Sequence, residues 1–177
     1  MTANWFQSML PSILEEYEGK DVFNADEAVL FYRCLLSKIL SFKGQSCSER
    51  KPSKELITVL EGCNSDGSEK LPLFVIGKRL KPQCFKNVRT LLVEYTANKK
   101  AWMITDWTTM FTDCIVKLDE RFLREKHKVG LIIDNCPAHP NTVLKAIKFI
   151  FLPPNTTSVL QPCDQGIIQN MKFFYRK

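Results

Sequence analysis

The strongest constraint on the fold is a change of hydrophobic period at Trp107. From there to Phe122, apolar residues recur at steps of three and four, which predicts an amphipathic helix capped at its start by Thr105 or Asp106. Three strand-like runs precede this helix, at residues 21–33, 57–63 and 71–76, and the turn-rich segment 64–70 joins the last two. Further strands are expected at 129–133 and 148–152, and further helices at 1–20, 142–147 and 165–177.

This order of elements predicts the fold class. Three consecutive strands can pair antiparallel, whereas strands separated by helices need crossovers and usually pair in parallel. We therefore expect an α/β fold with a mixed sheet, compatible with a ribonuclease H-like fold. With 177 residues, of which 45% are hydrophobic, the chain is long enough for one domain, spanning 1–177, and too short for two.

Composition excludes some classes and favours others. The seven cysteines form no C-x-x-C pair, which indicates reduced thiols in an intracellular protein. The amino-terminal sequence does not resemble a signal peptide, and no segment approaches the roughly 18 apolar residues of a membrane span, so no membrane partner is expected. A formal net charge of +6 favours a polyanion such as nucleic acid, although a solvated basic face would give the same excess.

Three aspartates occupy positions where a carboxylate is unexpected. Asp134 ends the apolar run 131–133, and Asp26 falls inside an apolar strand. Asp164 begins a helical stripe of apolar residues that is expected to face inward; its other members are Ile167, Ile168, Met171 and Phe174 or Tyr175. Each has a structural alternative, which is a loop cap for Asp134, an exposed edge position for Asp26 and a helix cap for Asp164.

Convergence of the three aspartates would predict a metal site. Repulsion among clustered carboxylates destabilises them unless divalent cations bind, and hard oxygen ligands select Mg²⁺ or Mn²⁺. Two such ions could activate a water or a 3′-hydroxyl for in-line attack on a phosphodiester. Zinc is the weaker alternative, because Cys136 and His139 form a single C-x-x-H with no second pair.

Six sequence blocks resemble the pogo/Tigger branch of the DDE superfamily, which includes Tigger transposable element-derived proteins and relatives of jerky and centromere protein B. The blocks are NADE (24–27), GSEKLPLFVIGK (67–78), CFKN (84–87), NKKAWM (98–103), DNCPAHP (134–140) and FLPPNTTSVLQPCDQG (151–166). The resemblance implies a ribonuclease H-like catalytic core in the nucleus, with Asp26, Asp134 and Asp164 as the catalytic triad. It also implies that these aspartates hold two divalent ions for nicking of DNA and strand transfer.

The chain departs from the family pattern at several positions. Ala28, Val29 and Leu36 stand where the family usually has threonine, glycine and proline, which suggests relaxed constraint or a domesticated copy. Family members carry tandem helix-turn-helix modules before the core, whereas about 25 residues precede Asp26 here. We therefore expect a catalytic core without an amino-terminal helix-turn-helix module, and the sequence leaves its oligomeric state open.

Without that module, DNA affinity would rest on phosphate contacts, which are independent of sequence and sensitive to salt. The candidate contact residues are Lys78, Arg79, Lys81, Lys99, Lys100, Lys172 and Arg176, with a solvated face as the alternative for each cluster. Trp102 and Trp107 could stack on bases or belong to the core. Three functions remain open: a metal-dependent DNA endonuclease and strand transferase, a domesticated nuclear DNA-binding protein without turnover, and a fragment whose core cannot fold.

Overall fold

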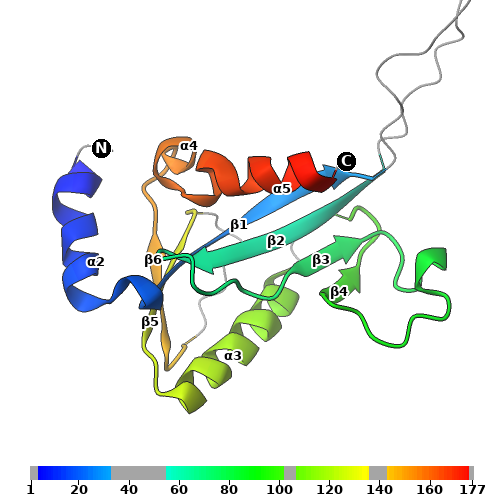
Figure 1. The fold of residues 1–177 in the computed structure, drawn as a ribbon, viewed down its shortest axis with the longest axis horizontal. Coiled ribbons are helices and arrows are strands. Elements are labelled where there is room, and N and C mark those ends of the chain that lie inside the picture. Colours follow the sequence, from blue (N-terminus) through cyan, green and yellow to red (C-terminus); the bar gives the residue numbers. More distant parts are fainter. Residues whose placement is uncertain (1–3, 33–54, 102–106, 136–142, 176–177) are drawn as a thin grey trace, which may run out of the picture.

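A computed structural model describes residues 4–32, 55–101, 107–135 and 143–175, with the backbone alone for 107–111. Six strands form one sheet in the order β4-β3-β2-β1-β5-β6 (Figure 1). They are β1 (Val22–Phe31), β2 (Leu56–Asn64), β3 (Phe74–Gly77), β4 (Glu94–Ala97), β5 (Val129–Ile133) and β6 (Ile147–Phe151). β2 pairs antiparallel with β1 and with β3, whereas the β1–β5, β5–β6 and β3–β4 pairs are parallel. The expected mixed sheet is therefore confirmed.

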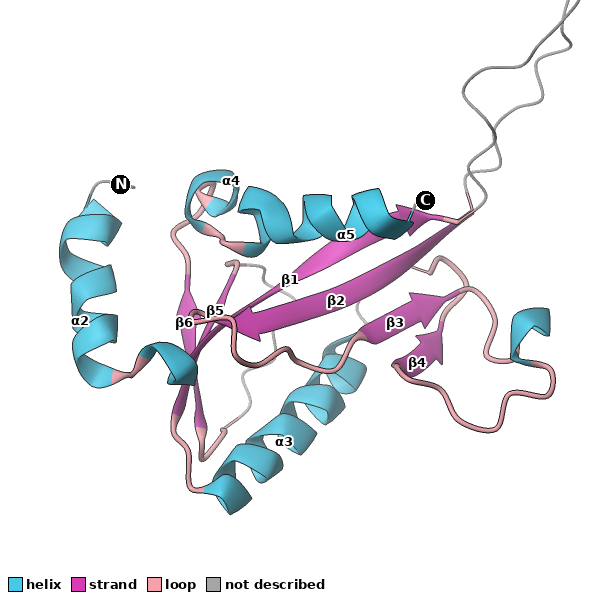
Figure 2. Ribbon diagram, in the orientation of Figure 1, coloured by secondary structure: helices cyan, strands magenta, loops and turns pink. Residues whose placement is uncertain are grey.

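Helices cover both faces of the sheet (Figure 2). The long helix α3 (Trp107–Glu125) packs on one face, and its Ile115, Leu118 and Phe122 share a core with Phe23 and Ala25 of β1. The other face carries α2 (Leu10–Glu16), α4 (Thr157–Leu160) and α5 (Ile168–Tyr175). The described residues also form four shorter helical segments: η1 (Trp5–Met9), η2 (Gly19–Asp21), η3 (Gln83–Phe85) and η4 (Cys163–Ile167).

Alternation along β1 distributes its side chains between these two layers. Phe23 and Ala25 face α3, whereas Val22 packs with Trp5 and Ile13 of the amino-terminal helices. Ala28 is fully buried against Cys163 and Ile168. The strand is therefore covered on both sides, and any polar group on it needs a partner or a function.

Two sequence-based expectations about elements are wrong. No strand is expected at 94–97, because the sequence EYTA contains no continuous apolar run, yet β4 pairs there with β3. The helix expected at 142–147 does not form over the described residues 143–146, and Ile147 begins β6. The carboxylate of Asp119 accepts the backbone N–H groups of Lys145, Ala146 and Ile147, so these amides are held outside any helix.

The last helix begins later than expected. Helical geometry is interrupted at Gly166, inside η4, and α5 starts at Ile168. As a result Asp164 lies on a turn and is exposed, while its neighbour Cys163 is fully buried. The inward face of this segment is made by Cys163, Ile168 and Met171 rather than by a stripe that begins at Asp164.

The longest described helix, α3, is amphipathic and carries charged residues along its outer face. Over the described part of the chain, no helix is long and apolar enough to cross a membrane.

Candidate active site

Two of the three aspartates lie just beyond the point where neighbouring parallel strands stop pairing. The β1–β5 register runs from Val22↔Gly130 to Asn24↔Ile132 and ends there. Asp26 stands two residues further along β1, and Asp134 stands two residues beyond Ile132, directly after β5. Separation of two parallel strands beyond their last paired residues opens the position where ligands gather in α/β sheets.

The third aspartate lies in the helical layer that contains α4 and α5. Asp164 lies in η4, and the backbone N–H of the preceding residue, Cys163, donates to Asn24 Oδ1 at 2.9 Å. The turn that carries Asp164 is therefore attached to β1 two residues before Asp26.

The electrostatics of Asp26 connect it to both of the other aspartates. Burial is the largest of the causes that raise the pKa of Asp26 from 3.8 to about 7, and the charges of Asp164 and Asp134 contribute to the same rise. The backbone N–H of Glu27, which donates to Asp26 Oδ1 at 2.7 Å, opposes these effects. The structure thus brings Asp26, Asp134 and Asp164 within electrostatic reach of one another, while their catalytic role stays a prediction.

Glu27 is a fourth carboxylate, and it is absent from the set of site residues expected from the sequence. Its side chain reaches the surface, yet desolvation by the surrounding protein raises the pKa of its carboxyl to about 8, with contributions from the charges of Asp134 and Asp26. The block NADE contains this residue beside Asp26, and that adjacency is the only signal in the sequence that could have indicated it.

Glu61 is a fifth carboxylate near the site. It lies directly opposite Asp26 in the β1–β2 register and is 7% exposed. Its Oε1 has no hydrogen-bond partner among the described residues. Burial raises the pKa of Glu61, and the positive charge of Lys172 on α5 partly offsets this. Lys172, expected to contact DNA, is half-buried beside this carboxyl.

The donor set fits a hard divalent cation in chemistry, because every candidate ligand is a carboxylate oxygen and their mutual repulsion favours a bound cation. Over residues 4–32, 55–101, 107–135 and 143–175, no three His, Cys, Asp or Glu side chains are arranged to hold one metal ion together. The zinc alternative, Cys136 with His139, falls outside the described residues and stays a prediction.

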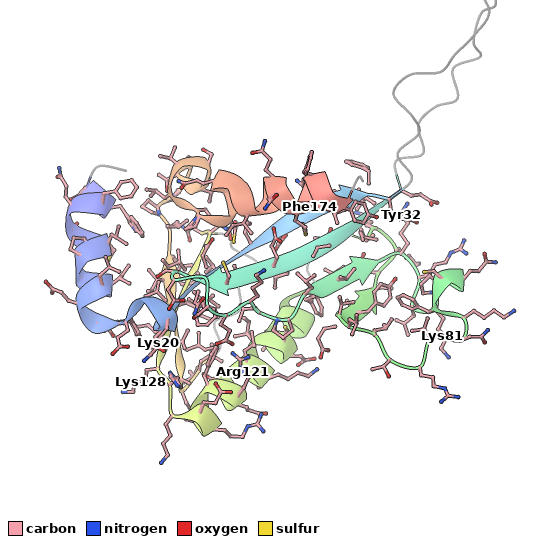
Figure 3. The ribbon with its side chains drawn as sticks, in the orientation of Figure 1. Lys20, Tyr32, Lys81, Arg121, Lys128 and Phe174 are labelled. Atoms are coloured by element: carbon pink, nitrogen blue, oxygen red, sulfur yellow. The ribbon has the colours of Figure 1, made fainter. Side chains whose placement is uncertain are left out.

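Five of the seven expected DNA-contact residues follow the carboxyl ends of two parallel strands. Lys78, Arg79 and Lys81 follow β3, and Lys99 and Lys100 follow β4. All five are exposed, and the Asn98 N–H donates to the Gly77 carbonyl at 2.9 Å, which joins the two strand ends. In Figure 3, Lys81 projects on the side opposite Lys20 and Lys128. Arg176, Trp102 and the side chain of Trp107 fall outside what the structure describes.

A single antiparallel strand inside an otherwise parallel sheet defines a ribonuclease H-like fold. The structure is similar to the Mos1 mariner paired end complex with Mn, with a TM-score of 0.59, 13% identity and coverage of 97% of this chain and 47% of that chain. The Mos1 transposase paired-end complex with the left transposon end gives a TM-score of 0.54.

The chain belongs to the DDE superfamily endonuclease family, whose sequence model matches residues 54–177. It is 43% identical over 173 residues to Tigger transposable element-derived protein 4 of Mus musculus, covering 97% of this chain and 33% of the relative. It is 34% identical over 179 residues to the Jerky protein homolog of Homo sapiens, covering 93% and 31%. The Major centromere autoantigen B of Homo sapiens is 32% identical over 169 residues, covering 94% and 27%.

These relatives confirm a core of the pogo/Tigger type. The chain spans about a third of the length of the curated relatives it matches.

Proposed function

We propose that this chain is a DNA endonuclease and strand-transferase core that uses two divalent cations, Mg²⁺ or Mn²⁺. One observation carries the proposal: the charges of Asp164 and Asp134 both act on Asp26, although the three residues come from separate elements. The pairing of the strands does not require carboxylates at this point, and each ionised carboxylate makes ionisation of the others less favourable. A group of this kind is typical of a site whose function is to bind cations.

In this proposal Asp26, Asp134 and Asp164 supply the oxygen ligands. When bound, divalent cations activate a water or a 3′-hydroxyl and stabilise the leaving oxygen of a phosphodiester. Glu27, with its raised pKa, retains a proton near neutral pH and so limits the repulsion that Asp134 and Asp26 experience.

DNA would be held by the five exposed basic side chains that follow β3 and β4. Their charges follow two strands that run parallel to β1, and phosphate contacts require no fixed sequence. One similar structure is Mos1 transposase in a complex with a transposon end, which supports DNA as the substrate class. A relative named for the centromere, a chromosomal structure, supports a location in the nucleus.

The test is nicking of supercoiled DNA by the purified chain in the presence of Mn²⁺ or Mg²⁺. The wild-type chain is expected to nick, Asp134→Asn is expected to lose nicking, and Asp113→Asn is expected to keep it. Asp113 is an exposed aspartate on α3 and serves as a matched control. A wild-type preparation that binds DNA and never nicks it, with either cation, would contradict the proposal.

A second function is favoured by a specific observation, which is that the described carboxylates are not arranged to hold one ion together. On that account the chain is a domesticated nuclear protein that binds DNA through its basic group and has no turnover. It predicts DNA affinity that falls with salt and is unchanged by Asp134→Asn. Cleavage that this substitution abolishes would exclude it.

A further inference from the structure

Asn24 occupies the junction of the three segments that carry the aspartates. Its side chain is buried, with 5% exposure, in the middle of the sheet. Its Nδ2 donates to the backbone carbonyl of Ile132 at 3.0 Å, and its Oδ1 accepts the backbone N–H of Cys163 at 2.9 Å. Asn24 lies two residues before Asp26, Ile132 lies two before Asp134, and Cys163 lies one before Asp164.

The position of Asn24 in the sheet explains why a side chain is needed there. Asn24↔Ile132 is the last pair of the β1–β5 register, so the backbone ladder cannot hold the two strands any further along. The side-chain amide of Asn24 adds one hydrogen bond to β5 at this end, through Ile132, and one to η4 in the helical layer, through Cys163. An amide can donate to one segment and accept from another at the same time without carrying charge.

A second amide ties the same turn to β1. Gln161 is 1% exposed, and its Nε2 donates to the carbonyl of Ala25, the residue before Asp26, at 3.2 Å. The thiol of Cys163, also buried, lies 3.7 Å from the carbonyl of Asn24. The turn that carries Asp164 therefore has three polar attachments to residues 24 and 25 of β1, all of them buried.

We propose that Asn24 and Gln161 are positioning residues that set the separation of Asp26, Asp134 and Asp164 for divalent-cation binding. This role rests on the proposed function, because it concerns the same three carboxylates. Buried side-chain hydrogen bonds fix the backbone on which each carboxylate stands, and loss of such an outer partner typically weakens cation affinity about 10- to 100-fold. Asn24 acts on all three segments, whereas Gln161 acts only on the turn before Asp164.

The experiment compares Asn24→Ala with Asn64→Ala in calorimetric titrations with Mn²⁺. Asn64 is a matched control: it is 3% exposed and lies opposite Phe23 in the β1–β2 register. Its amide makes three hydrogen bonds, to Lys20, Ser68 and Glu69, none of them to the aspartate-bearing segments. Asn24→Ala is expected to weaken Mn²⁺ binding by about 10-fold or more, and Asn64→Ala to leave it unchanged at a similar loss of thermal stability.

Gln161→Met keeps the test decisive if Asn24→Ala does not fold. It preserves the volume of the side chain and removes one hydrogen bond, to Ala25, together with an Oε1 that has no partner in the described part of the chain. Its cost in stability is therefore expected to be smaller than that of Asn24→Ala, which loses two hydrogen bonds and leaves a cavity. It is expected to weaken Mn²⁺ binding in the same direction as Asn24→Ala. Excess Mn²⁺ is expected to restore nicking in both variants and not in Asp164→Ala.

Hydrogen exchange distinguishes failure of this inference from failure of the proposed function. The backbone N–H of Cys163 is expected to exchange faster in Asn24→Ala than in the wild-type chain, with or without Mn²⁺. Wild-type affinity for Mn²⁺ in folded Asn24→Ala and Gln161→Met, or unchanged protection at Cys163, would overturn the positioning role. If exchange at Cys163 is faster in Asn24→Ala as expected but the wild-type chain binds no Mn²⁺, the cation site itself is overturned. The role of the two amides in that site is then overturned with it.

Discussion

At the scale of single residues, Asp26 and Glu27 define the chemistry of the candidate site. Both carboxyls are desolvated and lie near other carboxylates, so the folded chain binds their protons more tightly than the unfolded chain does. Asp26 has a pKa of about 7 and Glu27 of about 8, which places both titrations near neutral pH. The protonation of these two carboxyls therefore changes near neutral pH.

The first prediction concerns the stability of the cation-free chain. Because the pKa values of Asp26 and Glu27 are raised in the folded chain, ionising these carboxyls destabilises it. This loss of stability is absent below about pH 4 and grows as pH rises towards about 7 for Asp26 and about 8 for Glu27. We expect the free energy of unfolding in a chelator to fall between pH 5 and pH 8 by on the order of 2 kcal/mol, after allowance for solvent screening. Urea unfolding at the two pH values measures it.

Asp26→Asn is the companion variant for this prediction, because it removes the more buried of the two titrating groups. We expect it to be more stable than the wild-type chain at pH 8 without cations, and to show a smaller change with pH. A wild-type stability that is constant or rises from pH 5 to pH 8 would contradict the account.

The sequence predicts the three aspartates and cannot predict how their surroundings support them. Each aspartate stands out because a carboxylate interrupts an apolar pattern. Asn24, Glu61 and Gln161 leave no such trace, because a polar residue in a strand or a loop is ordinary until its burial is known. Their roles depend on contacts over more than 100 positions along the chain, as between Asn24 and Cys163.

At the scale of elements, one side chain of α3 binds the backbone at the start of β6. Asp119 is buried on α3, and its carboxylate accepts the N–H groups of Lys145, Ala146 and Ile147 at 2.8–3.1 Å. Burial alone would raise the pKa of Asp119, but these backbone hydrogen bonds outweigh it and lower the pKa below its ordinary value. The start of β6 is thus fixed by a helix on one face of the sheet.

The second prediction is that Asp119→Ala destabilises the chain by about 3 kcal/mol, because three backbone N–H groups lose a charged acceptor. Since the folded pKa is lowered, the stabilisation is present above the ordinary pKa of 3.8 and is lost as pH falls below it. Urea unfolding at pH 7 measures the effect, with Asp113→Ala on the same helix as a control. Equal stability of the two variants would refute this role.

The third prediction concerns the contact between β3 and the edge strand β4. A Cβ at Gly77 of β3 would lie 2.0 Å from Tyr95 Oη, which donates to the carbonyl of Arg79 at 2.8 Å. Gly77→Ala must displace the Tyr95 ring, which also packs edge-on against Phe85. We expect a loss of about 1–3 kcal/mol in unfolding free energy, and a smaller loss when Tyr95 is already alanine. Additive effects in this double-mutant cycle would exclude the contact as the cause.

Most strands and the long helix could be predicted from the sequence, whereas β4 and the segment before β6 could not. Strands β1, β2 and β5 and helix α3 have enough residues to show their period, and the structure confirms them. β4 has four residues and exists because β3 pairs with it. The helix expected near 142–147 is absent over its described part because Asp119, a distant residue, captures the backbone there.

At the scale of the whole molecule, positive charge gathers at the carboxyl ends of β3 and β4, whereas Lys20 and Lys128 precede strands at the opposite ends (Figure 3). If the first group binds DNA phosphates, removing two of its charges should lower the salt dependence of binding. The fourth prediction is that Lys78→Ala with Lys81→Ala reduces the slope of log affinity against log salt by about 2. Lys20→Ala with Lys128→Ala removes the same charge and should leave the slope unchanged.

Fluorescence anisotropy with a labelled duplex, repeated over a salt series, measures both double variants. A reduction of the slope by the control pair equal to that of the first pair would mean that net charge, and not the group after β3 and β4, sets the affinity.

The central claim is that the fold assembles Asp26, Asp134 and Asp164 into one cation site, and calorimetric titration of Mn²⁺ into the wild-type chain and Asp164→Ala tests it most directly. At pH 8, where Asp26 is ionised, the wild-type chain should bind Mn²⁺ saturably and Asp164→Ala should bind it more than about 100-fold more weakly. Equal binding by both chains, or no binding by the wild-type chain at millimolar Mn²⁺, would contradict the claim.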